Sequence, residues 1–158
     1  MKSFCLGVAA LAAALTFAAM AQTAPTSTDM QIFAQKVKAD KKLLVALNMQ
    51  LTDAEAKGFW PVYDAYQRDL EAIDGRLLKT IAAYADAYNS GPVPNETARQ
   101  LIDEYLAIQQ DEAKMNRSYV PKLGEALPGA KVARYIQVET KIRAVVRYEL
   151  AARIPLVQ

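Results

Sequence analysis

Histidine is absent from this 158-residue chain, and cysteine occurs once, at Cys5. Without histidine the chain lacks the commonest general base and metal ligand of proteins. Cys5 falls in a segment that we expect to be removed, so the remaining chain has no thiol for a disulfide, a nucleophile or a haem-attachment motif. A zinc or soft-metal site would have no ligands. These absences predict a protein that is not an enzyme and holds no metal or cofactor.

Residues 1–21 have the pattern of a cleaved export signal. Lys2 supplies positive charge, an Ala- and Leu-rich run follows, and Ala19-Met20-Ala21 has the small-x-small form of a cleavage site. The alternative is a membrane anchor, but the apolar run barely reaches a spanning length of about 20 residues and has no basic stop-transfer cluster. We therefore predict cleavage before Gln22, export to the periplasm and no stable membrane insertion of the mature chain.

A polar, flexible leader is expected over residues 22–28, followed by one all-helical domain over residues 29–158. Apolar residues three and four positions apart predict a first helix from Asp29 to near Asn48. The capping box Thr52-Asp53-Ala54-Glu55 predicts the start of a second helix.

The second helix has an apolar seam that runs from Phe59 to Tyr88, so it is on the order of 50 Å long at 1.5 Å per residue. Pro61 removes an N–H inside this helix and is expected to bend it. Gly91 and two prolines end it, and we expect Asn95 to cap the third helix.

Pro128 predicts the start of a fourth helix, which Pro155 closes. Short connections make neighbouring helices antiparallel, and no segment has the alternating pattern of a strand. The predicted fold is all-α, an elongated four-helix antiparallel hairpin or bundle with long, kinked helices.

Charge is nearly balanced overall but unevenly distributed. Residues 53–112 carry twelve acidic and five basic side chains, whereas residues 114–158 carry nine basic and three acidic ones. One interpretation is that acidic and basic helices pair within the bundle, and the other is that the basic half faces a partner. An exported chain with few aromatic-basic clusters is not expected to bind nucleic acid.

Some carboxylates lie near the apolar seams. For Glu112 and Glu139, the modest interpretation is a buried ion pair with Arg143 or Arg147, and Glu139 also stands four residues before Arg143, a spacing that favours pairing along a helix. The adjacent pairs Asp103-Glu104 and Asp111-Glu112 are expected on a solvated face, because neighbours in a helix point apart.

The chain contains two similar helix starts. Aligning Leu51 with Leu127 places Phe59 over Tyr135, so each copy has a leucine followed by an aromatic residue eight positions later. Together with the export signal and the four helices, this resembles the Spy/CpxP family of periplasmic proteins, which has two LTxxQ motifs that each open a helix. Here residues 51–55 read LTDAE, with Glu for Gln, and residues 127–131 keep only the leucine and the spacing, as in a divergent member.

The resemblance implies an antiparallel, cradle-shaped homodimer whose concave face binds unfolded client proteins without ATP, in the context of envelope stress. Aromatic side chains offer broad contact area and arginines attract acidic chains, so we predict that clients contact the set Trp60, Tyr63, Tyr66, Arg134, Arg143 and Arg147. The same aromatic residues, at helical spacing, are also suited to core or dimer contacts. Two other functions remain open, namely a regulatory module that binds the periplasmic sensor domain of a signalling protein and a structural envelope protein.

Overall fold

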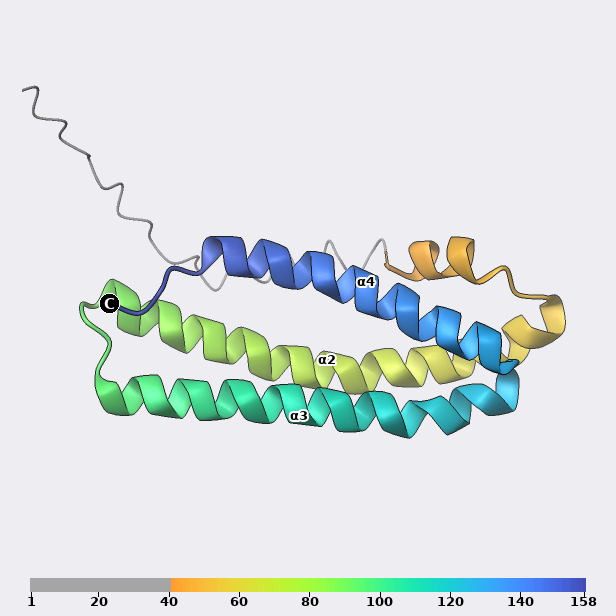
Figure 1. Ribbon diagram of the computed structural model, residues 1–158, viewed down its shortest axis with the longest axis horizontal. Coiled ribbons are helices and arrows are strands. Elements are labelled where there is room, and N and C mark those ends of the chain that lie inside the picture. Colours follow the sequence, from red (N-terminus) through yellow and green to blue (C-terminus); the bar gives the residue numbers. More distant parts are fainter. Residues whose placement is uncertain (1–40) are drawn as a thin grey trace, which may run out of the picture.

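A computed structural model describes residues 41–158, and the expected export signal, leader and start of the first helix lie outside this range. Residues 41–49 are helical and are followed by three long helices, α2 (Asp53–Asn89), α3 (Asn95–Ala126) and α4 (Gly129–Arg153). The all-α, elongated and antiparallel fold is confirmed (Figure 1). No helix within residues 41–158 is long and apolar enough to cross a membrane.

The predicted capping box starts α2. The Glu55 backbone N–H donates to the Thr52 hydroxyl at 3.3 Å, and the Thr52 N–H donates to the Glu55 carboxylate at 2.8 Å. The helix then continues through Pro61 to Asn89 without a break in its assignment. Its first turns leave the line of the rest of the helix in Figure 1, as expected where a proline removes a hydrogen bond.

The turn between α2 and α3 depends on Gly91, whose φ of 134° is open to glycine but unfavourable for other residues. The prediction that Asn95 caps α3 is wrong. Pro94 holds the cap position with extended backbone, and no side chain bonds the first turn. At the far end of the pair, a Cβ built on Gly58 would meet the Cβ of Ala126 at 3.1 Å, so glycine permits the close approach of α2 and α3 there.

The fourth helix and residues 41–49 cover the α2–α3 pair, which lies side by side below them in Figure 1. The first helix ends at Met49, one residue after the predicted end near Asn48. Gln50 then takes a φ of 48°, which costs a non-glycine residue on the order of 1 kcal/mol. At the other end of the molecule the tail returns to α2, where the Tyr84 hydroxyl donates to the Pro155 carbonyl at 2.8 Å.

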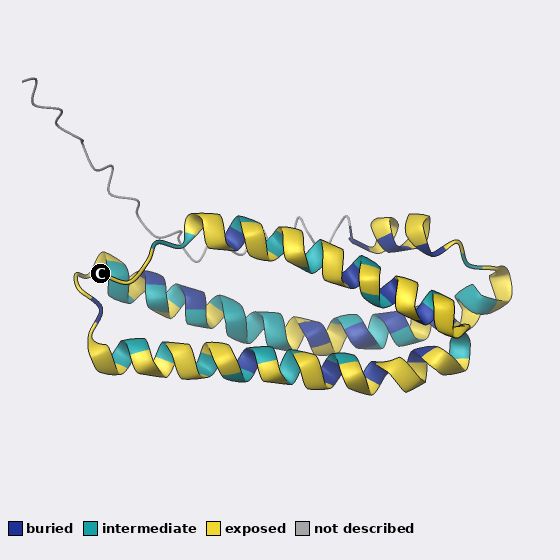
Figure 2. Ribbon diagram, viewed as in Figure 1, coloured by how far each residue is buried: buried dark blue, intermediate teal, exposed yellow. Residues whose placement is uncertain are grey.

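The main core lies in the half of the bundle that contains residues 41–49. Its largest fully buried side chains come from residues 41–49 and from all three long helices. They include Met49, Phe59, Tyr66, Leu123 and Tyr135. A smaller cluster around Ile81 and Leu150 joins α2 to α4 in the other half. The outward faces of all three long helices are exposed (Figure 2).

Candidate functional site

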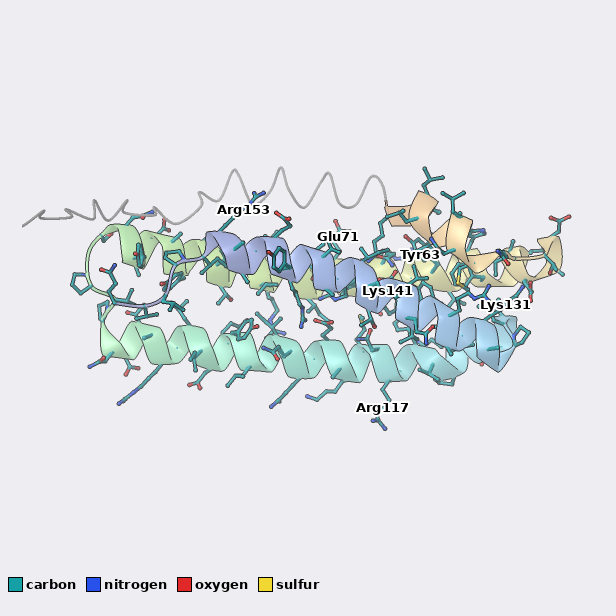
Figure 3. The ribbon with its side chains drawn as sticks, turned by 45° about the horizontal axis from the view of Figure 1, so that its top comes forward. Tyr63, Glu71, Arg117, Lys131, Lys141 and Arg153 are labelled. Atoms are coloured by element: carbon teal, nitrogen blue, oxygen red, sulfur yellow. The ribbon has the colours of Figure 1, made fainter. Side chains whose placement is uncertain are left out.

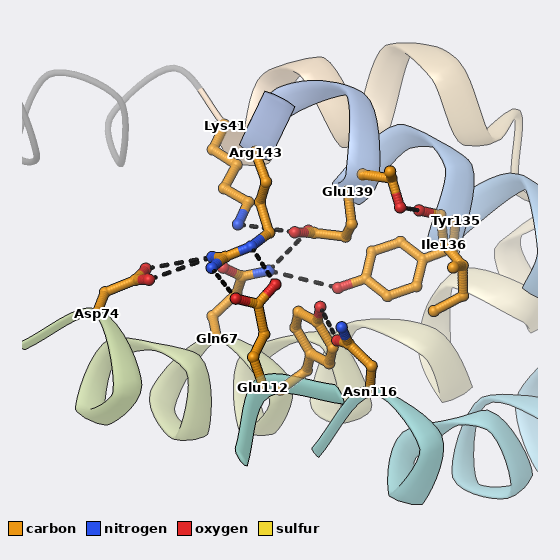
Figure 4. A network of polar contacts seen from close by, with 11 residues as sticks. Lys41, Gln67, Asp74, Glu112, Asn116, Tyr135, Ile136, Glu139 and Arg143 are labelled. Carbon is orange, nitrogen blue, oxygen red and sulfur yellow. Dashed lines mark hydrogen bonds and ion pairs between the residues drawn. The ribbon is translucent and has the colours of Figure 1, made fainter. Parts of the chain in front are cut away.

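Charged side chains meet where α4 crosses the α2–α3 pair (Figure 4). Arg143 of α4 donates two hydrogen bonds to Glu112 of α3, at 2.8 and 2.7 Å, and a third to Asp74 of α2 at 3.2 Å. Arg147 donates to the same Glu112 carboxylate. Burial is the largest single influence and opposes the charge of Arg143, but the hydrogen bonds and negative charges of Glu112 and Asp74 together outweigh it and raise the pKa of this guanidinium. This bidentate pair fixes α4 on the hairpin.

Glu139 is the most deeply buried acidic side chain of the site, with 3% of its side chain exposed. Gln67 of α2 donates to its Oε1 at 2.8 Å. Lys41 Nζ lies 2.8 Å from its Oε2, yet no donor within residues 41–158 meets that oxygen with hydrogen-bond geometry. Glu139 thus links α4 to α2 by a hydrogen bond and to residues 41–49 by charge alone.

Four tyrosines surround this network. Burial, reinforced by the negative charge of Glu139, raises the pKa of Tyr63, Tyr66 and Tyr135. Burial and a hydrogen bond to Asp69 raise the pKa of Tyr119 to about 12. All four hydroxyls therefore stay protonated at neutral pH, and those of Tyr66, Tyr119 and Tyr135 form hydrogen bonds within the bundle.

A small cleft opens beside the network, between α2, α3 and α4. It has a volume of about 170 Å³ and is lined by Tyr66 and Asn116 on one side and by residues of α4 from Ile136 to Arg147 on the other. The Tyr66 hydroxyl donates to Asn116 at 2.6 Å across its floor. Because the carboxylates at its wall already have cationic partners, the cleft has no uncompensated charge with which to attract an ion.

The aromatic residues predicted to contact clients lie mostly inside the protein. Tyr63 and Tyr66 are 4% and 1% exposed, because α4 and residues 41–49 cover the face of α2 that carries them. Trp60 is half-buried and packs edge to face with Phe59 and Tyr63. In this arrangement a client can reach part of Trp60 but neither of the two tyrosines.

The three arginines predicted to contact clients also differ in their exposure. Arg143 is held inside the network, Arg147 is half exposed at its rim, and Arg134 is exposed on the outer face of α4. The expected ion pair of Glu112 with Arg143 and Arg147 is confirmed. The expected pairing of Glu139 with these arginines is wrong, because Glu139 contacts Lys41 and Gln67 while both arginines bind Glu112 of α3.

The prediction of a solvated face holds for most of the acidic neighbours on α3, since Asp103 is exposed and the side chains of Glu104 and Asp111 are 43% and 39% exposed. It is wrong for Glu112, whose side chain is 12% exposed. Arg76 of α2 donates to Glu104 at 2.9 Å and to Asp111 at 2.7 Å, and Glu112 binds α4. The basic helix α4 therefore pairs with the acidic helices α2 and α3 within the bundle. This agrees with the first of the two interpretations of the charge distribution.

Several large apolar side chains remain exposed on α3, on α4 and on residues 41–49. They are Leu43, Leu44, Leu47, Ile102, Tyr105, Leu106, Val120, Val145 and Tyr148, with Leu156 and Val157 in the tail. On α3 the group Ile102, Tyr105 and Leu106 falls on neighbouring positions of one face. Charged side chains such as Arg117 project from the same helix away from the bundle (Figure 3).

Within residues 41–158 no three His, Cys, Asp or Glu side chains gather closely enough to hold a metal ion, and the buried carboxylates are engaged by cations. No family model, characterised protein or solved structure matches the chain.

Proposed function

We propose that the protein is an exported binding protein that holds unfolded proteins without ATP, as the Spy/CpxP resemblance implies. The observation that carries the proposal is the set of exposed apolar side chains on rigid helices. Ile102 and Leu106 are 60% and 51% exposed on α3, and Val145 and Tyr148 are 63% and 73% exposed on α4. Burial of such side chains by a partner lowers the free energy of the complex.

Separate apolar side chains among charges are suited to many client sequences. Each contact buries a modest apolar area, so no single client sequence is demanded, and the charged neighbours keep the protein soluble between clients. Exposed Arg134 and half-exposed Arg147 on α4 add attraction for acidic segments at low salt. Trp60, half-buried at the edge of the aromatic cluster, extends the contact area on α2.

The test is the suppression of aggregation of an unfolded model protein at near-stoichiometric ratios. We expect the wild-type protein to suppress light scattering, and the double variant Ile102→Ser, Leu106→Ser to lose at least half of that effect at an unchanged melting temperature. The matched control on the same helix is Gln100→Ser, Gln110→Ser, which changes exposed polar residues only. Equal suppression by both variants would show that α3 is not the contact surface, and no suppression by the wild type would refute holdase activity.

The burial of Tyr63 and Tyr66 favours a second candidate, a regulatory module for the periplasmic sensor domain of a signalling protein. Because these two rings are covered, the free apolar surface is smaller than a broad client cradle requires and is better suited to one defined partner. Saturable binding of a single folded domain, with no suppression of aggregation, is the result that supports this function over the first.

A further inference from the structure

Residues 41–49 insert three side chains between α2 and α4 at intervals of four positions. Lys41 is 8% exposed, and Val45 and Met49 are both fully buried. The two apolar side chains join the core cluster that contains Phe59, Tyr63 and Tyr135, and the lysine ammonium reaches Glu139. We call the surface formed by these four residues, Phe59, Tyr63, Tyr135 and Glu139, the covered face.

Residues 41–49 are held on the covered face by contacts that a different helix can replace. A buried ion pair between a lysine and a glutamate contributes little net stability, because both groups lose their hydration, but it discriminates strongly between matched and mismatched partners. Here the match is incomplete, since Glu139 Oε2 receives the charge of Lys41 without a hydrogen bond of normal geometry. A second pair, Lys42 with Asp64 at 2.9 Å, lies exposed at the edge.

The way residues 41–49 join the chain allows them to leave without damage to α2. Gln50 links them to α2 through a backbone conformation that is unfavourable for a non-glycine residue. The first turn of α2 has its own capping box, formed by Thr52 and Glu55, so its N–H groups stay satisfied when the segment departs. The outward side of the segment is also apolar, with Leu43 and Leu47 63% and 67% exposed.

We propose that residues 41–49 are an internal ligand of the covered face, and that this face also binds an amphipathic helix of a partner protein. The partner helix carries a basic residue followed by apolar residues four and eight positions later, the pattern of Lys41, Val45 and Met49. Apolar anchors on one side of a helix are a common basis of helix recognition in grooves. Glu139 selects the basic residue, and Phe59, Tyr63 and Tyr135 receive the apolar ones. The proposal rests on the proposed function, because it names one class of segment that the protein captures.

The experiment uses the full chain and a fluorescein-labelled synthetic peptide of residues 36–50. In the variant Val45→Asp, Met49→Asp the internal ligand is expelled, and we expect the peptide to bind at least tenfold more tightly than to the wild type. The matched control, Leu43→Asp, Leu47→Asp, places the same charges on the exposed side of the segment and is expected to bind the peptide as weakly as the wild type. Emission of Trp60, the only tryptophan, reports the release, because Lys42 Nζ lies 5.2 Å from its ring.

A charge exchange then tests the role of Glu139. Adding Glu139→Lys to the releasing variant is expected to weaken binding of the peptide at least tenfold and to restore binding of a peptide that carries Lys41→Glu. If the releasing variant loses its cooperative thermal transition, Lys41→Glu in the full chain replaces it, since that change opposes two carboxylates at the same place.

The proposal is overturned if the releasing and control variants bind the peptide equally, or if the charge exchange changes neither peptide's affinity. Aggregation assays on the same proteins separate this result from the proposed function. Peptide binding without suppression of aggregation refutes holdase activity and supports the helix site, whereas suppression that persists while the peptide fails to bind refutes the helix site alone.

Discussion

The rings of Phe59 in α2 and Tyr135 in α4 meet edge to face, with centroids 5.1 Å apart and planes at 80°. Each ring stands eight positions after the leucine that precedes its helix, Leu51 or Leu127. The two similar helix starts in the sequence therefore contact each other through their equivalent aromatic residues. This contact lies at the centre of a cluster that also includes Tyr63 and Tyr66.

The contact predicts a measurable coupling between the two rings. In a double-mutant cycle with Phe59→Leu and Tyr135→Leu, we expect a coupling free energy of about 0.5–1.5 kcal/mol, the usual value for an edge-to-face pair. Urea unfolding of the four proteins provides the free energies. As a control, Phe59→Leu and Tyr88→Leu lie at opposite ends of α2 and should add to within about 0.5 kcal/mol. Additive effects for the first pair would contradict the contact.

The bidentate pair of Glu112 and Arg143 predicts that Glu112→Gln, a small change in shape, lowers the free energy of unfolding strongly. In Glu112→Gln two guanidinium groups lose their shared carboxylate, and Arg143, with 14% of its side chain exposed, keeps only the longer pair with Asp74. Removal of one partner of a buried pair costs about 3–5 kcal/mol. We expect the free energy of unfolding to fall by about 3 kcal/mol at pH 7, measured by urea denaturation.

The control for this change is Glu125→Gln on the same helix. Glu125 is exposed, so its substitution is expected to change the free energy of unfolding by less than about 0.5 kcal/mol. Similar values for the two variants would mean that the network is solvated in solution and does not hold α4.

The capping box of α2 predicts part of the acid sensitivity of the protein. A hydrogen bond from Lys131 and another from the Thr52 N–H lower the pKa of Glu55 from 4.5 to about 2. Because the folded pKa is below the unfolded one, the folded state gains stability above pH 4.5 and loses this gain as the pH falls from 4.5 toward 2.

Thermal unfolding of the wild type and of Glu55→Gln across this pH range measures the contribution. We expect the melting temperature of the wild type to fall more steeply between pH 5 and pH 2, since the variant has no carboxylate to protonate. Parallel curves would exclude Glu55 as a source of the acid sensitivity.

A homodimer remains a prediction of this structure. The exposed group on α3 and the pair Val145 and Tyr148 on α4 leave apolar surface that a second copy can cover. Sedimentation equilibrium at micromolar concentration is expected to give twice the mass of the mature chain. A monomer at all concentrations would contradict the homodimer and would leave these side chains available to other partners.

Local signals in the sequence predicted the helices well, because each signal acts within a few residues. The Thr52–Glu55 box fixed the start of α2, and Gly91 fixed its end. Asn95 was misassigned because Pro94, with its rigid and extended backbone, already occupies the position before the helix. Asn95 is a residue type favoured at helix N-caps, but three positions later stands Ala98, so it lacks the second half of a capping box.

The candidate site was only partly predictable, because helical periodicity identifies an apolar face without saying what covers it. Tyr63 and Tyr66 stand on the face predicted for clients, but α4 and residues 41–49 lie over it. The partner of Glu139 is nearly a hundred positions away, at Lys41, and no local spacing points to it. The pairing of α4 with the hairpin had two signals, namely the uneven charge of the two halves of the chain and the position of Glu112 near an apolar seam.

The short turn at residues 90–94 has a consequence for the order in which the chain folds. Contacts between α2 and α3 close a small loop, whereas those of residues 41–49 with α4 join distant parts of the sequence and therefore form more slowly. In pulsed hydrogen exchange we expect amides of α2 and α3 to be protected first and those of residues 41–49 last. A chain synthesised from its N-terminus has α2 ready to contact Val45 and Met49 early, but the side of these residues that packs against Tyr135 stays in water until α4 is complete. During that interval this side is open to other chains.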